Sequence, residues 1–199
     1  MSDPILMAIT GASGSIYGLR LVEALAGPDL RIPVGLVVSR AGRLVMEHEL
    51  GIPAAPDAGL LEERVDPETL GRVTLFAPED LAAPFSSGSR RFSALVIVPC
   101  SMNTVAAVAA GLTLNLIHRL ADVALKERRT LILVPREAPM SVTHLENLLS
   151  LARKGVVILP ASPAFYHRPA RIDDLVDFLA GRILDQLGLD HKLYRRWQG

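Results

Sequence analysis

Short apolar runs that each end in a polar turn and give way to a helical pattern constrain the fold more than any other feature of this sequence. A strand buried on both faces of a parallel sheet reads as a continuous apolar run, and helices between such strands cover the two faces. The sequence therefore predicts an α/β fold, a three-layer αβα sandwich with a mostly parallel sheet of Rossmann-like or flavodoxin-like type. The predicted strands are residues 5–9, 32–38, 94–98, 131–134 and 156–159, with an edge strand at 73–76.

The length and composition favour one domain without a nucleic-acid or membrane partner. Half of the 199 residues are hydrophobic, so residues 1–199 are expected to form a single domain, with a C-terminal tail from about residue 189. The 21 basic residues balance 21 acidic ones, which gives no overall attraction for nucleic acid or an anionic membrane. A lone cysteine, Cys100, and the lack of a signal pattern or a bilayer-length apolar run indicate a cytoplasmic protein. The five histidines show no metal-ligand spacing, so no metal site is expected.

The first predicted strand ends in a glycine-rich turn. Residues 10–15 read TGASGS, and together with Gly18 the glycines follow a GxxGxxxG pattern. Glycine lets the backbone approach a ligand closely, while the hydroxyls and the first helix amides can receive a phosphate or a flavin edge. Tight packing of the strand against the helix explains the same glycines equally well.

Polar side chains also follow two other predicted strands. Ser39 and Arg40 end the second strand, where they suit a phosphate, and the sequence PCSMNT at 99–104 follows a later one. The amides after Cys100 are the better ligand surface, because no nearby histidine could activate its thiol. Before that strand, SSGS at 86–89 lies in a long loop, which is either a phosphate-contacting lid or a plain solvated loop.

Charged residues gather in one predicted helix and in the loop after the strand that follows it. Arg119, Asp122 and Lys126 lie three and four residues apart, as in an exposed ion-pair ladder. The many apolar residues around them favour instead a helix packed on most sides, in which a lysine would need an anion. Two prolines flank Arg136 and Glu137 and fix their loop. We therefore expect the cations and Glu137 to converge at the carboxyl end of the strand, where α/β sheets bind ligands.

Six motifs, taken in order, cover nearly the whole chain. They are TGASGSIYGLRL at 10–21, SSGS at 86–89, PCSMNT at 99–104, RLADVALKERR at 119–129, PREAP at 135–139 and PAFYHRP at 163–169. In this combination the chain resembles the UbiX family of flavin prenyltransferases. The resemblance implies a flavin-binding domain that takes reduced FMN and dimethylallyl monophosphate, alkylates the flavin at N5 and closes the new ring onto C6. It also implies delivery of prenylated FMN to a UbiD-type decarboxylase, and a trimer-based dodecamer with active sites at subunit junctions.

The same resemblance assigns roles to residues at matching positions. FMN contacts are implied for Gly11, Ala12, Ser13, Ser39, Ser101, Met102, Thr104 and Arg119. The donor phosphate would be held by Lys126, Arg136, Tyr166 and Arg182, with Ser87 or Ser89. Catalytic roles are implied for Ser13, Glu49, Lys126 and Glu137. Fixed cations and hydroxyls suit a metal-free reaction in which an allylic phosphate leaves as positive charge develops on carbon, and the carboxylates can remove the flavin ring proton.

Two other functions remain compatible with these patterns. A flavin-dependent decarboxylase of the phosphopantothenoylcysteine type has a similar fold and a similar flavin loop, although the histidine that such enzymes carry after an early helix has no counterpart in this sequence. A non-catalytic flavin carrier, or a chaperone that binds a UbiD-type protein, would conserve the flavin loops without the chemistry. Addition of one five-carbon unit to the flavin distinguishes the prenyltransferase from both.

Overall fold

Six parallel strands form the centre of the protein. The computed structural model describes residues 3–53, 61–62 and 64–197. The strands are β1 (Ile5–Ile9), β2 (Val34–Val38), β3 (Val73–Phe76), β4 (Ala94–Cys100), β5 (Thr130–Pro135) and β6 (Val157–Ile158). They lie in the order β3-β2-β1-β4-β5-β6 and every neighbouring pair is parallel. This is the strand order of Rossmann folds, so the structure selects one of the two predicted types, and the edge strand at 73–76 is confirmed.

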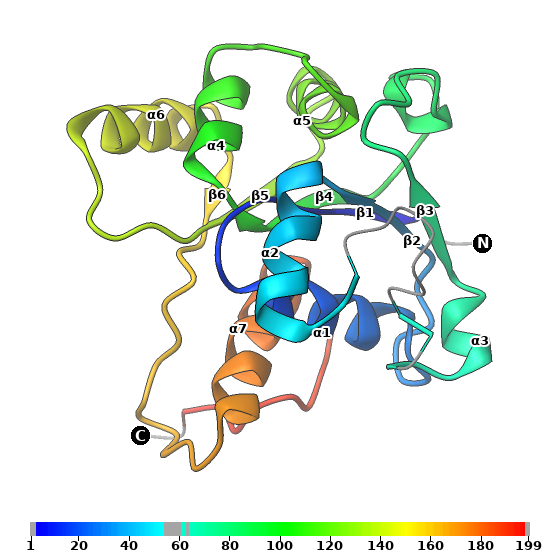
Figure 1. Ribbon diagram of the computed structural model, residues 1–199, viewed down its shortest axis with the longest axis vertical. Helices are drawn as coiled ribbons and strands as arrows, with labels where there is room; N and C mark the ends of the chain where they lie inside the picture. The colour runs from blue at the N-terminus through cyan, green and yellow to red at the C-terminus, as the bar shows by residue number, and fades with distance from the viewer. Residues whose placement is uncertain (1–2, 54–60, 63, 198–199) are drawn as a thin grey trace.

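Helices cover both faces of the sheet, as the sequence predicts. They are α1 (Ser15–Ala26), α2 (Arg40–Leu50), α3 (Pro67–Leu70), α4 (Met102–Ala109), α5 (Leu116–Lys126), α6 (Val142–Arg153) and α7 (Ile172–Gln186), with a 3₁₀ turn η1 (Pro84–Ser86). In Figure 1, α4, α5 and α6 lie above the sheet, while α1 and α7 lie below it. Leu6 and Ala8 of β1 join the apolar cluster on the first face, whereas Met7 and Ile9 join the cluster on the second. This alternation is what a strand buried on both faces requires.

The segment before β3 differs from the prediction. The proline-, alanine- and acid-rich composition of residues 51–72 predicts one short helix near residues 60–65, of which residues 60 and 63 lie outside the described residues. Residues 61, 62, 64 and 65 form turns and a bend, and the helix in this region is α3. Asp66 accepts a hydrogen bond from the Thr69 amide, and Pro67 occupies the first helical position. A capping carboxylate and a proline at that position start a helix, which explains why it begins here.

Two glycines of the GxxGxxxG pattern have different structural reasons, a backbone conformation in the turn at Gly14 and close helix packing at Gly18. Gly14 has a φ of 106°, a conformation that residues with a Cβ rarely adopt. A Cβ on Gly18 would lie 2.5 Å from the carbonyl oxygen of Val98, so α1 can pack directly against β4 only with glycine there. The packing interpretation of the pattern is therefore confirmed at Gly18.

Among the described residues, no helix combines the length and the apolar character that crossing a lipid bilayer requires.

Candidate functional site

Polar loops at the carboxyl ends of three neighbouring strands form the first part of the candidate site. The loops follow β2, β1 and β4, which are adjacent in the sheet. These loops and the first turn of α4 contain every residue for which FMN contact is predicted except Arg119: Gly11, Ala12, Ser13, Ser39, Ser101, Met102 and Thr104. The chain leaves β1 toward one side of the sheet and β4 toward the other. The crevice at such a switch in direction is where Rossmann folds bind their ligands.

Hydroxyl groups tie these loops together. Thr10 is buried, and its hydroxyl donates to the carbonyl oxygen of Pro99 at 2.9 Å and accepts from the Ser101 amide at 2.7 Å. Ser101 in turn caps α4, because its Oγ accepts from the Thr104 amide at 3.3 Å. Ser39 caps α2 by accepting from the Gly42 amide at 2.9 Å. The two capping serines therefore hold two helix N-termini, which favour anions, at the same crevice.

Glu49 occupies the N-terminus of the third helix at this edge. Its carboxylate accepts hydrogen bonds from the amides of Gly14, at 3.0 and 3.1 Å, and Ser15, at 3.0 Å. Burial raises the pKa of Glu49, but hydrogen bonds from the Ser13 side chain and from the Ser15 and Gly14 amides outweigh it, and the pKa lies below its ordinary value. Glu49 is thus ionised near neutral pH. The first amides of α1, which the sequence suggested for a phosphate or a flavin edge, are bound to a carboxylate instead.

Tyr17 is a neighbour of this group that the sequence analysis missed. A Cβ on Gly14 would lie 2.8 Å from the Tyr17 ring, so the ring packs over the turn. Burial raises the pKa of Tyr17, and the charge of Glu49 raises it further. The available signal was its position three residues after Gly14, which places both on one face of the first helical turn.

Arg136 and Glu137 follow β5, the strand next to β4, and so lie at the same edge of the sheet as the flavin loops. Arg136 is exposed. Glu137 is partly buried, and its Oε1 accepts from the Ala138 amide at 3.2 Å. Cys100 at the end of β4 is fully buried, and burial raises the pKa of its thiol, which fits the expectation that it is no nucleophile.

Lys126 lies at the opposite edge of the sheet, contrary to the expected convergence with Arg136. It ends α5 just before the amino end of β5, whereas Arg136 follows the carboxyl end. The six residues of β5 separate the two edges by roughly 20 Å. The side chain of Lys126 is also 46% exposed, with Glu127 Oε1 at 3.8 Å. The helix is packed on most sides, as expected, but its lysine stands on the remaining exposed face.

The serine loop, residues 86–90, is bound along α5. The segment before the loop also contacts this helix, since the Leu116 amide donates to Pro78 O at 2.7 Å. Further along, Arg119 Nε donates to Ser86 O at 2.9 Å, while its Nη1 pairs with Asp122 at 2.7 Å. The loop is therefore not a plain solvated loop, and phosphate contact by its serines stays a prediction.

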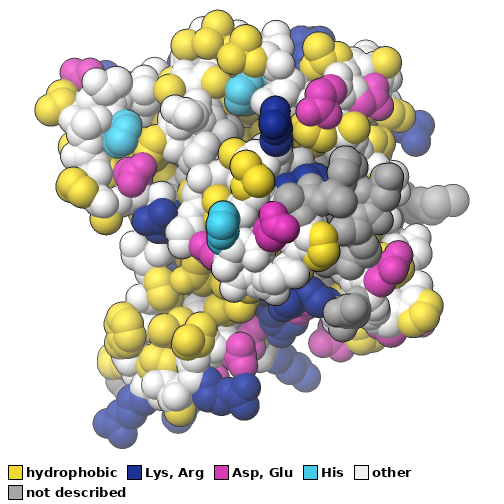
Figure 2. Space-filling model, in the orientation of Figure 1, with side chains coloured by type: hydrophobic (Ala, Val, Ile, Leu, Met, Phe, Trp, Pro, Cys, Tyr) yellow, Lys and Arg dark blue, Asp and Glu magenta, His cyan; other side chains and the backbone are white. Residues whose placement is uncertain are grey.

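Tyr166 and Arg182 form a third group with the C-terminal segment. The Tyr166 ring meets Phe178 and Trp197 edge-on, with centroids 5.7 and 5.5 Å apart. Phe178 lies one helical turn before Arg182 on α7, and both line a cavity of about 420 Å³ beside β6. Figure 2 shows Lys and Arg side chains gathered at the lower end of the molecule. Four arginines before α7 and in the C-terminal segment are exposed: Arg168, Arg171, Arg195 and Arg196.

Asp185 connects Arg182 to the C-terminal segment. Its carboxylate binds Arg182 Nη1 at 2.7 Å, the Tyr194 hydroxyl at 2.6 Å and Arg196 Nη2 at 2.7 Å. His191 Nε2 lies 3.1 Å away. Burial raises the pKa of Asp185, but the hydrogen bonds from Tyr194, Arg196 and His191 prevail and lower it to about 2.

The Asp185 network predicts a pH-dependent loss of stability in Asp185→Asn. Because the folded-state pKa lies below the ordinary value, the stabilisation is complete above about pH 4 and disappears as the pH falls toward 2. We expect the variant to lose about 1–2 kcal/mol at pH 7, and the difference from the parent to shrink between about pH 4 and 2. Denaturant unfolding across this range measures it. In a Tyr194→Phe background the loss should be smaller, and a loss that is equal at pH 7 and pH 2 would contradict the assignment.

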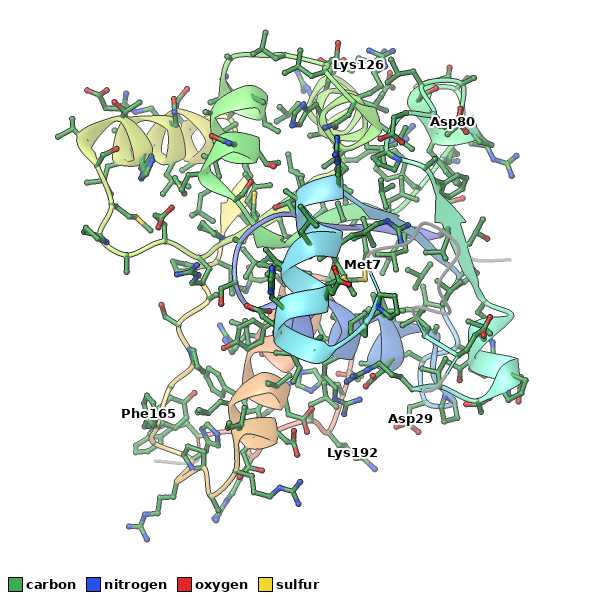
Figure 3. All side chains as sticks on the ribbon, in the orientation of Figure 1. Met7, Asp29, Asp80, Lys126, Phe165 and Lys192 are labelled. Carbon is green, nitrogen blue, oxygen red and sulfur yellow. The ribbon has the colours of Figure 1, made fainter. Side chains whose placement is uncertain are left out.

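Within one chain the predicted donor-phosphate residues lie in separate places. Figure 3 shows Lys126 at one end of the long axis of the molecule and Phe165, the neighbour of Tyr166, at the other. One chain thus presents a flavin crevice with Arg136 and Glu137, a serine-loop group on α5, and a C-terminal group.

His118 contributes to none of these groups. It is buried on α5, burial lowers its pKa, and its Nδ1 has no hydrogen-bond partner among the described residues. Among all the residues that the structure describes, no three His, Cys, Asp or Glu side chains are grouped so that they could hold a metal ion.

Comparisons with known proteins agree with the fold and the motifs. A family model described as Flavoprotein matches residues 2–184. A flavin prenyltransferase UbiX from Methanothermobacter thermautotrophicus is 48% identical over 98% of this chain and 95% of its own. The crystal structure of AnUbiX in complex with FMN and dimethylallyl pyrophosphate is 38% identical with a TM-score of 0.87, and covers 100% of this chain and 99% of that one. A dodecameric FMN-dependent UbiX-like decarboxylase from Escherichia coli O157:H7 is 40% identical with a TM-score of 0.85, and covers 98% of this chain and 100% of that one.

Proposed function

This chain belongs to the flavoprotein family and, within it, to the UbiX flavin prenyltransferases, and we propose that it transfers a dimethylallyl group from a dimethylallyl phosphate to N5 and C6 of reduced FMN. The observation that carries this proposal is that the family-motif loops after β1 and β4 meet at the carboxyl edge of the sheet, where the Thr10 hydroxyl joins them. A relative that matches the whole chain binds both FMN and dimethylallyl pyrophosphate. The decarboxylase and carrier alternatives are not favoured by these relatives.

The residues at the crevice fit a flavin mononucleotide. Ser39 and Ser101 place the N-termini of α2 and α4 there, and helix N-termini bind phosphate through their amides. Gly11, Ala12 and Ser13 present backbone and hydroxyl groups from the turn after β1. Met102 and Thr104 lie in the first turn of α4. The α1 N-terminus is bound by Glu49, so in this proposal the FMN phosphate binds at the other two helices.

Cations and hydroxyls would bind the donor phosphate. Bond cleavage leaves negative charge on the phosphate oxygens, and fixed positive groups stabilise that charge as it develops. Lys126, Arg136 and Arg182 would supply the charge, and Tyr166 with Ser87 or Ser89 would donate hydrogen bonds. Arg119 would act from α5 beside them, where its Nε already binds the carbonyl oxygen of Ser86.

Two carboxylates would handle the protons. The reduced flavin supplies the nucleophilic N5 and C6 atoms, and closing the new ring requires loss of a ring proton. Glu137 lies at the end of β5 and is partly buried beside the flavin loops, so we assign it to this proton. Glu49, which is ionised at the α1 N-terminus, would exchange a proton with the released phosphate, assisted by Ser13.

The donor site would be completed by more than one chain. Lys126 and the C-terminal group lie at opposite ends of one chain, yet all are assigned to one small phosphate. We therefore propose a trimer-based dodecamer with sites at subunit junctions, in line with the dodecameric relative. We also propose that residues 1–199 form one domain around the single sheet, that the protein acts in the cytoplasm, and that its prenylated FMN passes to a UbiD-type decarboxylase.

An anaerobic incubation with FMN, a reductant and a dimethylallyl phosphate tests the proposed function. We expect mass spectrometry to find the flavin plus one five-carbon unit, with the monophosphate and the pyrophosphate compared as donors. Bound flavin without any adduct would favour the carrier, and release of carbon dioxide from a cysteine peptide would favour the decarboxylase. Either outcome would replace the proposal.

A further inference from the structure

The serine loop is held between two aromatic anchors. Phe85 packs edge-on against Phe76 before the serines, with ring centroids 5.9 Å apart, and Phe92 is buried after them. Phe85 and Phe92 also meet edge-on, with centroids 6.2 Å apart. Ser87 and Ser89 are exposed between these anchors. The apolar core therefore fixes the two ends of the loop, but it does not fix the conformation of the exposed serines between them.

Arg129 fixes the backbone of the loop at its C-terminal end. Its Nη2 donates to the Gly88 carbonyl oxygen at 2.7 Å, and its Nη1 donates to that of Arg90 at 2.9 Å. The guanidinium also lies over the Phe92 ring, 4.4 Å from the centroid. Arg129 thus joins two carbonyls of the serine loop to one of its aromatic anchors.

The hydrogen bonds of Arg129 determine how the serines are presented. Together with Arg119, which binds Ser86 O, it bonds the carbonyls of three alternate residues to the α5 side. The hydroxyls of the residues between them, Ser87 and Ser89, lie 2.9 Å apart. A cationic donor binds a carbonyl more strongly than a neutral one does, and the planar guanidinium fixes the geometry of both bonds.

Close contact with the end of α5 restricts the loop further. A Cβ on Gly88 would lie 2.2 Å from Glu127 Oε1, and the same oxygen is 3.8 Å from Lys126 Nζ. Arg129 draws the Gly88 carbonyl into this contact. Gly88, which stands between the two serines, and Lys126 therefore lie beside the same carboxylate oxygen of Glu127.

We propose that Arg129 is a positioning residue for the donor phosphate, which acts by fixing Ser87 and Ser89 beside Lys126 and does not touch the phosphate itself. This inference rests on the proposed function, because it assigns the serines and Lys126 to the prenyl phosphate. Preorganised donors bind without the cost of ordering the loop, so loosening the loop weakens binding of the donor more than it slows the chemistry.

Kinetics of Arg129→Met and Arg129→Lys test the proposal in the full-length protein. We expect Arg129→Met to raise KM for dimethylallyl monophosphate roughly tenfold, with kcat and the Kd for FMN nearly unchanged. Arg129→Lys, which keeps the charge and one donor, should recover part of the loss. The matched control is Arg128→Met, since Arg128 is exposed and its side chain makes no hydrogen bond within the described chain. It removes the same charge one residue away and should leave KM unchanged.

Hydrogen exchange of residues 84–92 gives a readout that needs no turnover. Exchange should be faster in Arg129→Met than in the parent and in Arg128→Met, and calorimetry should show weaker binding of dimethylallyl monophosphate. If the parent protein forms no flavin adduct, the proposed function is wrong. Hydrogen exchange and calorimetry would still show whether Arg129 orders a phosphate site. The proposal is overturned by unchanged loop exchange in Arg129→Met, or by faster exchange with unchanged donor affinity. Arg129→Lys provides the same comparison if Arg129→Met does not fold.

Discussion

Lys126→Ala and Arg182→Ala proteins, each nearly inactive alone, are expected to regain prenyl transfer when the two chains are expressed together. In the proposed site each substitution removes a cation that would stabilise the departing phosphate, which should slow transfer about 10²-fold or more. The two residues lie in separate groups of one chain, at the end of α5 and on α7 beside the C-terminal segment. If one site takes Lys126 from one chain and Arg182 from another, a mixed oligomer contains some intact sites.

The expected recovery has a definite size. With equal amounts of both chains and random assembly, roughly a quarter of the sites receive Lys126 from an Arg182→Ala chain and Arg182 from a Lys126→Ala chain. The specific activity should therefore approach that fraction of the parent value. Size-exclusion chromatography verifies that the mixture assembles as the parent does.

A control separates shared sites from simple mixing. The Lys126→Ala and Arg182→Ala proteins, purified and mixed without subunit exchange, should stay inactive. A double variant co-expressed with Lys126→Ala should also stay inactive, because no chain then supplies Lys126. If co-expression of the two single variants restores nothing although mixed oligomers form, the two residues act within one chain or in different sites.

Glu137→Gln is expected to slow formation of the flavin adduct by about 10²–10⁴-fold, the usual range for loss of a general base. Gln retains the size of Glu and can accept the hydrogen bond that Glu137 Oε1 now accepts from the Ala138 amide, so the loop after β5 should keep its shape. FMN binding should remain close to the parent value. Single-turnover mass spectrometry under reducing, anaerobic conditions measures the rate of adduct formation.

Glu146→Gln is the matched control for this substitution. Glu146 is exposed on α6, the helix that follows the same loop, and the change removes one negative charge. Its rate should equal that of the parent. An unchanged rate in Glu137→Gln would remove Glu137 from the reaction and leave Glu49 as the carboxylate to examine.

The sequence predicted the layers and much of the crevice because both depend on local patterns. Apolar runs marked five of the six strands, and a weaker run marked the edge strand β3. Parallel strands share one carboxyl edge, so polar residues that follow β1, β2, β4 and β5 had to lie on it. The strand order was not readable in this way, because it depends on which helices pack on which face. The roles of individual site residues remain predictions.

The sequence itself separates Lys126 from Arg136 along the strand between them. A lysine four residues before a strand lies near the amino end of that strand, and an arginine directly after it lies near the carboxyl end. The sequence contained that information, but the shared charge of Lys126 and Arg136 suggested one cluster. Lys126 and Arg136 can still act in one site, provided that the Lys126 of a second chain lies at the carboxyl edge of the sheet.

The sequence by itself determined that strands and helices alternate and that hydroxyls, glycines and cations stand at their ends, because spacing and residue type decide local structure. Only the tertiary structure decided which of these groups meet. Glu49 reaches the Gly14 amide across 35 residues, and Arg129 binds the serine loop across 41 residues at Gly88. Such contacts depend on how distant segments pack, since many different partners along the chain could satisfy the same carboxylate or guanidinium.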